Sequence, residues 1–192
     1  MPEYTWITDD VFTVDEFLSA EECEQYVTLS ESLGFDDAPI NTTFGAEMRP
    51  DLRNNQRVML DDVERAEELW SRIRDYVPLH RDNWAAIGVN ERLRFYRYDV
   101  GQQFQWHYDG SFERTSGERS LLTFMVYLNE RFLGGETSFG DLQGVPGLAA
   151  GKVVPKTGRA LVFAHPLLHR GAMVLEGRKY VLRTDVMYRP ND

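Results

Sequence analysis

The sequence has a single cysteine, no long apolar run and few lysines. Cys23 is the only cysteine among 192 residues, so an internal disulfide is excluded, and this favours a reducing, cytoplasmic location. No histidine stands at a motif spacing from Cys23, and we expect a buried, inert thiol. No apolar stretch approaches the roughly 18–20 residues of a transmembrane helix, and no basic segment followed by an apolar run opens the sequence. We therefore expect neither a membrane span nor a secretory signal.

Positive charge is scarce overall and unevenly distributed. The net charge of −10 argues against sequence-independent binding of nucleic acid or of an anionic membrane, since both require a basic surface. Residues 1–75 hold 19 acidic side chains against six arginines and no lysine, whereas residues 76–192 hold 15 basic against 12 acidic side chains. A site for a small anion is therefore expected in the second part of the chain.

The first part of the chain predicts short strands followed by a helix. Residues 4–14 alternate loosely, as one or two short strands would. Ser19 and Glu22 form a capping-box pattern, so a helix is expected to start there and to run to about Leu33, with Gly34 as its stop.

A second helix and a long loop are also expected in this part. Asp61, with Glu64 three residues later, predicts the cap of a helix that reaches Ile73 and carries apolar side chains at helical spacing. The segment 35–56 is long and polar, which is typical of a lid or a substrate loop.

From about residue 92 the pattern changes to short β-type runs separated by glycine. These runs fall at 92–100, 102–107, 121–128, 137–139, 152–154, 159–164, 169–175 and 179–188. Short strands at this spacing predict an antiparallel sandwich or barrel with the helices packed outside. We expect one domain over residues 1–192, with a helical and strand layer over 1–91 and a mainly β core over about 92–190.

The triplet His107-Tyr108-Asp109 ends one of these runs. The two-residue period of a strand places the side chains of His107 and Asp109 on the same face. An imidazole nitrogen and a carboxylate oxygen are two of the three ligands in the facial triad that holds non-heme Fe(II). Alone the triplet is a weak signal, because chance produces one in about every third chain of this composition.

A third ligand and a buried cation strengthen this signal. Both His165 and His169 follow a strand-like run, and either could complete the triad. Lys179 stands ten residues beyond His169 and shares one face of its run with Arg183. A lysine that points into a β core is costly unless an anion neutralises it. The alternative is that Lys179 lies on an exposed strand end.

Taken together, these segments resemble a known family. The set comprises the stretch from Tyr98 to Asp109, then Tyr127-Leu-Asn-Glu and Gly134-Gly-Glu-Thr, then His169 with Lys179. In order and spacing it resembles the 2-oxoglutarate and Fe(II)-dependent dioxygenases, in particular the prolyl 4-hydroxylase-like branch. The resemblance covers the second half of the chain and implies a double-stranded β-helix, or jelly-roll, core with flanking helices.

The resemblance also implies a metal, a cosubstrate and the residues that bind them. It implies Fe(II) held by His107, Asp109 and His169, and it favours His169 over His165 because the spacing from His169 to Lys179 is the one that this branch uses. Lys179 would pair with the distal carboxylate of 2-oxoglutarate.

Three further residues are expected near the cosubstrate. By the same resemblance Tyr98 and Tyr127 would line its pocket, although both could instead be ordinary core tyrosines with hydrogen-bonded hydroxyls. Arg183 could assist Lys179, contact the substrate or form an internal ion pair with Asp185 or another carboxylate, and we expect the ion pair.

The implied reaction couples oxidative decarboxylation of 2-oxoglutarate, giving succinate and carbon dioxide, to hydroxylation of a C–H bond by dioxygen, with ascorbate as a candidate reductant. The family implies a protein prolyl residue as substrate, and a free amino acid or a small metabolite stays open. The basic and amide side chains that could hold a carboxylate or a peptide backbone are Arg49, Arg53, Asn54, Asn55 and Arg57. These side chains could equally balance the acidic helices.

Two other functions are compatible with the same residues. One is a cupin-like metal enzyme that uses the triad without 2-oxoglutarate, and the other is a non-catalytic jelly-roll binding module. Lys179 distinguishes the 2-oxoglutarate-dependent enzyme from both of these functions, because only 2-oxoglutarate requires a cation in the pocket. The sequence does not indicate an oligomeric state.

Overall fold

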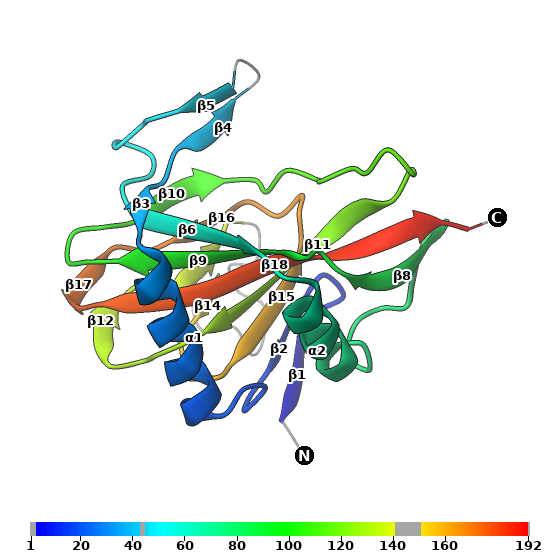
Figure 1. The fold of residues 1–192 in the computed structure, drawn as a ribbon, viewed down its shortest axis with the longest axis horizontal. Coiled ribbons are helices and arrows are strands. Elements are labelled where there is room, and N and C mark those ends of the chain that lie inside the picture. Colours follow the sequence, from blue (N-terminus) through cyan, green and yellow to red (C-terminus); the bar gives the residue numbers. More distant parts are fainter. Residues whose placement is uncertain (1–2, 43–44, 141–150, 192) are drawn as a thin grey trace.

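A computed structural model describes residues 3–42, 45–140 and 151–191 (Figure 1). Its largest element is a ten-stranded sheet in which each described pairing is antiparallel. The main path of this sheet runs through β1 (Tyr4–Thr8), β2 (Val11–Val14), β15 (Ala160–Ala164), β11 (Arg119–Tyr127), β18 (Lys179–Pro190), β9 (Arg92–Tyr98), β6 (Gln56–Asp61) and β3 (Asp36–Asp37). Beside this path, β8 (Trp84–Val89) pairs with β18, and β7 (His80–Arg81) pairs with β8.

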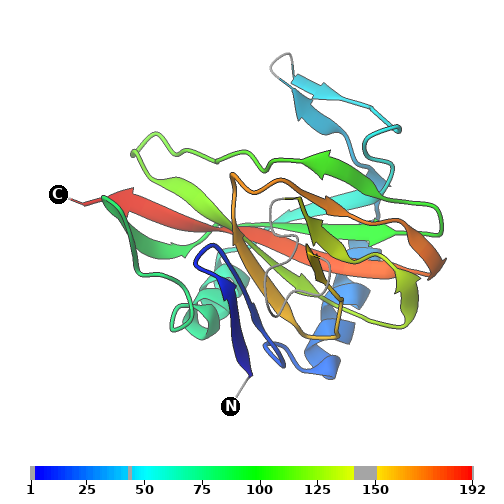
Figure 2. The ribbon, with the colours of Figure 1, turned by 180° about the vertical axis from the view of Figure 1, so that it is seen from behind.

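A smaller sheet faces the large one. It consists of β10 (Phe104–His107), β16 (His169–Gly171), β13 (Thr137–Phe139) and β14 (Lys152–Val153). Two two-stranded sheets complete the described strands: β12 (Phe132–Gly134) with β17 (Val174–Gly177), and the hairpin of β4 (Ile40–Thr42) and β5 (Gly45–Glu47). Figure 2 views the molecule from the opposite side to Figure 1, so that the smaller sheet lies in front, and the β4–β5 hairpin projects from the edge of the molecule.

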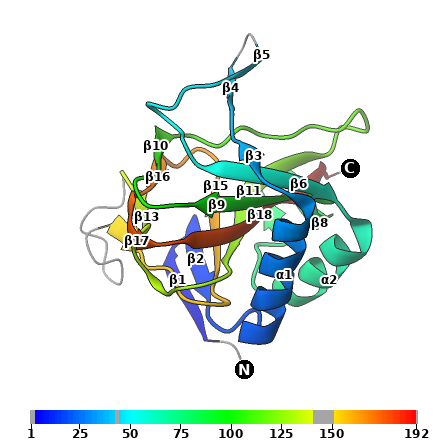
Figure 3. The same ribbon diagram turned by 60° about the vertical axis from the view of Figure 1, so that its left-hand side comes forward.

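The two helices cover the other face of the large sheet, away from the smaller sheet (Figure 3). The core is therefore split by the large sheet into two clusters. On β11, for example, Phe124 packs among the residues under the helices, whereas Tyr127 packs between the sheets. Tyr127 follows Phe124 by three positions, and an odd separation places the two side chains on opposite faces of the strand. The sheets and helices confirm the predicted β sandwich with helices outside.

Both helices form where capping signals stand in the sequence. Helix α1 (Ala20–Leu33) has the predicted capping box, in which the Glu22 backbone N–H donates to the Ser19 hydroxyl at 3.1 Å and the Ser19 N–H donates to Glu22 at 2.8 Å. Gly34 ends the helix with φ of 81°, a value that favours glycine. Cys23 is fully buried in α1, and burial raises the pKa of its thiol to about 11.

Helix α2 (Val63–Ile73) begins one residue later than expected. Its cap is Asp62, whose carboxylate accepts from the Arg65 backbone N–H at 2.9 Å, and not Asp61. Asp61 is the last residue of β6 and pairs with Arg92 on β9 at 2.8 Å. Glu64 three residues later favoured Asp61 in the sequence, but Asp61 is held in the β6–β9 ladder, so the neighbouring Asp62 caps the helix.

The N-terminal part of the chain contains more strand than the sequence indicated. The expected loop over 35–56 holds β3 and the β4–β5 hairpin, and strands β6 and β8 were not predicted. The boundary expected near residue 91 is also absent from the sheet, because β2, β6 and β8 pair with β15, β9 and β18. The expected run 169–175 divides into β16 and β17. Within the described residues, no helix is both long enough and apolar enough to span a membrane.

Candidate active site

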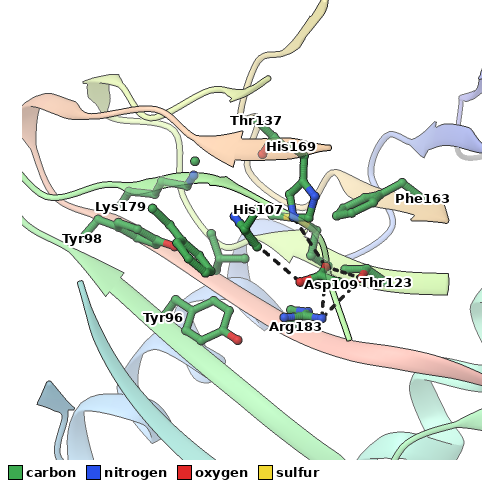
Figure 4. Close-up of a pocket in the computed structure, with 14 residues that line it drawn as sticks. Tyr96, Tyr98, His107, Asp109, Thr123, Thr137, Phe163, His169, Lys179 and Arg183 are labelled. Carbon is green, nitrogen blue, oxygen red and sulfur yellow. Dashed lines mark hydrogen bonds and ion pairs between the residues drawn. The ribbon is translucent and has the colours of Figure 1, made fainter. Parts of the chain in front are cut away.

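Two histidines and an aspartate meet between the sheets (Figure 4). His107 ends β10, Asp109 follows two residues later, and His169 begins β16 in register with His107. One potential ligand atom from each residue lies within 4.8 Å of the others. The Nε2 atoms of His107 and His169 lie 3.7 and 3.5 Å from the Asp109 carboxylate. The structure thus gathers the three residues proposed from the sequence, while His165 faces Asp185 at 3.6 Å instead.

The backbone fixes both imidazoles with their Nε2 atoms free. His107 Nδ1 lies 2.7 Å from the carbonyl oxygen of Gln105, and His169 Nδ1 lies 2.9 Å from that of Leu167. A carbonyl oxygen only accepts, so Nδ1 carries the proton and Nε2 keeps its lone pair. Burial lowers the pKa of His107 to about 3 and also lowers that of His169. Both rings are therefore neutral near pH 7, which is the form that binds a metal.

Asp109 is held as a carboxylate. Burial alone would raise its pKa, but the Arg183 guanidinium and the two imidazoles outweigh burial and hold the pKa far below its ordinary value. Asp109 Oδ2 accepts a hydrogen bond from the Thr123 hydroxyl at 2.6 Å and lies 3.1 Å from the Arg183 guanidinium. Such partners orient a ligating carboxylate from behind. Two neutral imidazoles and one carboxylate are the donor set that suits non-heme Fe(II).

A cavity extends from these three residues toward Lys179. We call it the inner cavity; its lining residues are Tyr96, Tyr98, Phe104, His107, Asp109, Thr123, Met125, Thr137, Phe163, His169, Gly171, Lys179, Val181 and Arg183. The Lys179 side chain, only 2% exposed, donates to the Gly135 carbonyl at 2.6 Å and lies 5.1 Å from the Tyr98 ring centre. No carboxylate of the described residues forms an ion pair with it, and burial lowers its pKa to about 7, a shift that the charge of Glu136 opposes only in part.

The close approach of the Gly135 backbone to Lys179 explains why glycine stands at position 135. Its φ is +68°, and a Cβ there would lie 3.1 Å from Lys179 Cδ and 2.9 Å from the Phe132 ring. A larger residue would therefore displace the lysine that the carbonyl positions. A buried, unpaired ammonium group at one end of a cavity and a metal-binding donor set at the other fit a chelating anion such as 2-oxoglutarate.

The structure separates the two predicted cosubstrate tyrosines. Tyr98 lines the inner cavity, and burial raises its pKa to about 12, so its hydroxyl stays protonated. Tyr127 does not line the cavity, which corrects the expectation for it. Its hydroxyl lies 2.6 Å from the Thr137 hydroxyl, and its ring centre lies 5.5 Å from Lys179 Nζ. Tyr127 supports the cavity wall because it stands at the end of β11, one side chain behind the lining residues.

Arg183 lines the inner cavity and forms the expected internal ion pair. Its guanidinium lies 3.3 Å from Asp185 and 3.1 Å from Asp109. The pairing with Asp185 was predicted from the sequence, whereas the pairing with Asp109 was not. Asp109 and Arg183 come from separate parts of the chain, and only the packing of β18 against the loop after β10 brings them together.

A wider groove opens on the other side of the same metal-binding residues. Arg53 and Arg57 line it, as does Tyr96. Asn55 is fully buried and lines neither the inner cavity nor the groove, so the prediction that it contacts the substrate is wrong. Its side chain instead accepts from Arg53 Nε at 2.8 Å and donates to the Gln56 carbonyl at 2.9 Å.

Sequence reasoning missed several lining residues, Tyr96 among them. Tyr96 stands two positions before Tyr98 on β9, and the strand period places both side chains on the same face. The same period extends to Arg94, which lines the groove. Phe104 and Phe163 were also missed; their rings lie 3.5 Å from the His107 ring centre and 4.6 Å from the His169 ring centre, respectively.

Two facing antiparallel sheets with the donor set between them define the molecule as a double-stranded β-helix protein with a candidate non-heme iron centre. Residues 93–184 match the 2OG-Fe(II) oxygenase superfamily, and this part of the chain belongs to that superfamily. Fe(II) and 2-oxoglutarate are the metal and the cosubstrate of the superfamily.

Curated relatives that match most of the chain are named as prolyl 4-hydroxylases or probable prolyl 4-hydroxylases. Probable prolyl 4-hydroxylase 8 of Arabidopsis thaliana is 28% identical over 88% of this chain and 65% of its own length, and prolyl 4-hydroxylase 5 is 27% identical over 85% and 63%. The chain therefore spans less than two thirds of the length of these two relatives. This similarity agrees with the prolyl 4-hydroxylase-like branch named from the sequence.

Solved structures share the fold. The viral collagen prolyl hydroxylase of Paramecium bursaria Chlorella virus-1, in its 2-oxoglutarate complex, aligns with a TM-score of 0.64 at 22% identity and covers 94% of this chain and 97% of its own. A Trichoplax adhaerens prolyl hydroxylase, solved with a hypoxia inducible factor peptide fragment, aligns with a TM-score of 0.68 at 17% identity and covers 93% and 84%. These likenesses establish the double-stranded β-helix.

Proposed function

We propose that the protein is an Fe(II)- and 2-oxoglutarate-dependent dioxygenase that hydroxylates a C–H bond. One observation carries the proposal: His107, Asp109 and His169 share a buried cavity with Lys179, a cation without a described carboxylate partner. In the balanced reaction, one oxygen atom of dioxygen enters the substrate as hydroxyl, and the other enters succinate as 2-oxoglutarate loses carbon dioxide.

The protein side chains have separate roles in this proposal. His107 and His169 bind the metal through Nε2, and Asp109 binds it as a carboxylate that Thr123 and Arg183 orient. Bound iron and 2-oxoglutarate supply the oxidising chemistry for the C–H bond. The protein positions the reactants and keeps water out of a cavity whose walls are largely aromatic and aliphatic.

Cosubstrate binding is assigned to the closed end of the inner cavity. Lys179 pairs with the distal carboxylate of 2-oxoglutarate, and this pair relieves the cost of a buried ammonium group. The protonated Tyr98 hydroxyl, on the same wall, is a hydrogen-bond donor for the cosubstrate. Arg183 is assigned to the metal end, because its guanidinium lies 3.1 Å from Asp109.

The substrate is proposed to be a prolyl residue of a peptide or a small molecule with a similar C–H bond. The names of the relatives support the prolyl alternative, since each is called a prolyl 4-hydroxylase. We further propose one domain, a cytoplasmic location, which the single buried cysteine supports, ascorbate as reductant, and no nucleic acid or membrane partner, which the net charge of −10 supports.

An anaerobic titration tests the proposal directly. Addition of Fe(II) and then 2-oxoglutarate to the wild-type protein should produce a weak visible charge-transfer band. The band should be lost in His107→Ala and kept in His80→Ala, a matched variant of an exposed histidine on β7. If the protein bound iron but 2-oxoglutarate produced no band, the result would indicate a cupin-like enzyme. If the folded protein bound no iron, the result would indicate a binding module.

A succinate-release assay then identifies the substrate. Prolyl peptides, free proline and other amino acids are supplied separately to the iron-loaded enzyme under air. The prolyl proposal expects release above the substrate-free background with a proline-containing compound. If only non-prolyl compounds stimulated succinate release, the prolyl proposal would be wrong and the substrate would be another C–H bond.

A further inference from the structure

The groove that opens beside the metal-binding residues has an excess of positive charge. We call it the arginine groove, because four arginines line it: Arg53, Arg57, Arg94 and Arg183. Two carboxylates line the same groove, Asp109 and Asp185. If His107 is neutral, two positive charges remain without compensation.

The two carboxylates already have partners. Arg94 lies 2.9 Å from Asp185, and Arg183 lies 3.1 Å from Asp109 and 3.3 Å from Asp185. Asp109 is also committed to the proposed metal site. Arg53 and Arg57 therefore have no carboxylate partner among the described residues.

Arg53 is buried, fixed and incompletely hydrogen-bonded. It is 5% exposed, and its guanidinium lies 4.7 Å from the Tyr96 ring centre and 4.5 Å from that of Phe104. Nε donates to Asn55, whereas Nη2 is buried without any hydrogen-bond partner. An unpaired buried donor on a charged group costs free energy, so this side chain is preorganised for an acceptor that enters the groove.

Arg57 adds a second unpaired guanidinium on the same wall. It pairs in register with Tyr96 across the β6–β9 ladder, and this places it on the groove face of the sheet. Burial lowers the pKa of Arg57, and the neighbouring charges of Arg53, Arg94 and Arg183 lower it further. Like charges thus repel one another here, and a negatively charged ligand would relieve the repulsion.

The groove reaches the proposed site of reaction. It shares His107, Asp109, Tyr96, Phe104 and Arg183 with the inner cavity, whereas Lys179 lines only the inner cavity and Arg53 and Arg57 line only the groove. An anion bound by Arg53 and Arg57 is therefore distinct from the carboxylate assigned to Lys179. It would lie on the side of the metal-binding residues that is open to exposed residues such as Tyr108.

We propose that the arginine groove binds a carboxylate of the substrate, so that the enzyme hydroxylates carboxylate-bearing compounds. This inference rests on the proposed dioxygenase function. Guanidinium groups bind carboxylates through paired hydrogen bonds with defined geometry, and Arg53 and Arg57 offer such donors beside the metal-binding residues. The carboxylate belongs either to a free amino acid or to an acidic residue of a peptide, and the chemistry of recognition is the same.

Calorimetric titration with matched probe pairs tests the inference. Protein loaded anaerobically with Fe(II) and 2-oxoglutarate is titrated with L-proline and L-prolinamide, with N-acetyl-L-proline and its amide, and with peptide amides that carry Asp or Asn beside a proline. At least one carboxylate compound should bind about 10-fold or more tightly than its amide partner. Preference in the amino-acid pairs indicates a free acid as substrate, and preference in the peptide pair indicates an acidic peptide.

Three variants connect the preference to the groove. Arg57→Gln should remove it, and Arg57→Lys should restore part of it. Arg97→Gln should leave the preference intact, because Arg97 lies on the opposite face of β9 and pairs with Glu31 at 2.9 Å. Equal binding of acids and amides, or a preference that survives in Arg57→Gln, would overturn the inference.

The charge-transfer band separates this inference from the proposed function. A normal band in a protein that does not distinguish acids from amides would leave the dioxygenase proposal standing and remove the carboxylate site. The titrations are repeated on metal-free protein. Suppose that the metal-free protein shows an Arg57-dependent preference, and that the same protein forms no band after Fe(II) and 2-oxoglutarate are added. This result would retain the anion site and remove the dioxygenase proposal.

Discussion

Two buried cations on one strand differ in what surrounds them. Lys179 and Arg183 lie four residues apart on the same face of β18, and both line the inner cavity. Arg183 has two carboxylate partners, Asp109 and Asp185, whereas Lys179 has a backbone carbonyl and two aromatic rings. Burial lowers the pKa of Lys179, while burial of Arg183 is outweighed by Asp109 and other partners that raise its pKa.

This difference separates a structural charge from a ligand-binding charge. The Arg183 charge is compensated within the protein, so it contributes to the fold of the free protein. In the proposed function, the Lys179 ammonium group gains an ion-pair partner when 2-oxoglutarate enters, so its burial destabilises the free protein and favours binding. The same contrast holds in the arginine groove, where Arg94 is paired and Arg53 is not.

The largest expected effect is the loss of stability in Arg183→Met. Removal of the guanidinium leaves the buried Asp109 and Asp185 carboxylates with less compensation, and breaking a buried pair typically costs about 3–5 kcal/mol. Urea unfolding of the metal-free protein measures the change. Arg92→Met is the matched control, since the exposed Arg92–Asp61 pair should contribute at most about 1 kcal/mol. Equal losses in the two variants would contradict a structural role for Arg183.

The second effect is on cosubstrate affinity in Lys179→Met. Loss of the charge-assisted contact should weaken 2-oxoglutarate binding by about 10–100-fold or more, whereas the stability of the metal-free protein should stay the same or increase. Anaerobic titration measures the affinity, and urea unfolding measures the stability. A destabilised variant with unchanged affinity would reverse the assignments of Lys179 and Arg183.

The sequence predicted much of this contrast because the strand period is regular. It placed Lys179 and Arg183 on one face of their strand, and it placed His107 and Asp109 on one face of a different run. It also predicted the Arg183–Asp185 pair. Long-range packing limited the rest. No local pattern relates Arg183 to Asp109, or Gly135 to Lys179, because these contacts depend on how separate strands align.

Residues in irregular segments were the hardest to place. Asn55 and Arg53 are separated by one residue, and their polar character suggested that both meet a substrate. The structure buries Asn55 completely and uses it to hold Arg53. Burial of a polar side chain outside a regular strand has no periodic signal, so sequence reasoning could not distinguish the residue that lines the groove from the residue that supports it.

The third effect is a pH dependence of stability that Lys179 should introduce. Its pKa falls from 10.5 to about 7 in the folded protein, so between these pH values the unfolded chain binds the proton and the folded protein does not. Stability should therefore rise with pH across this window, by up to about 1.4 kcal/mol per pH unit relative to Lys179→Met. Urea unfolding of both proteins from pH 7 to 10 measures the difference. A difference that stays flat or falls with pH would show that the free lysine is already compensated.

The smallest effect should come from Tyr127→Phe, which tests the boundary between the cavity wall and its support. The Tyr127 hydroxyl is buried against the Thr137 hydroxyl, so its removal should lower the free energy of unfolding by about 1 kcal/mol. Because Tyr127 does not line the inner cavity, 2-oxoglutarate affinity should change less than about twofold, well below the effect of losing a charge-assisted contact. Thermal unfolding and anaerobic titration measure the two quantities.

Tyr98→Phe is the matched comparison, since it removes a hydroxyl from the cavity wall itself and should weaken cosubstrate binding more. If Tyr127→Phe weakened binding as much as Tyr98→Phe, the cosubstrate site would have to extend behind Thr137, and the separation of lining residue from supporting residue would fail.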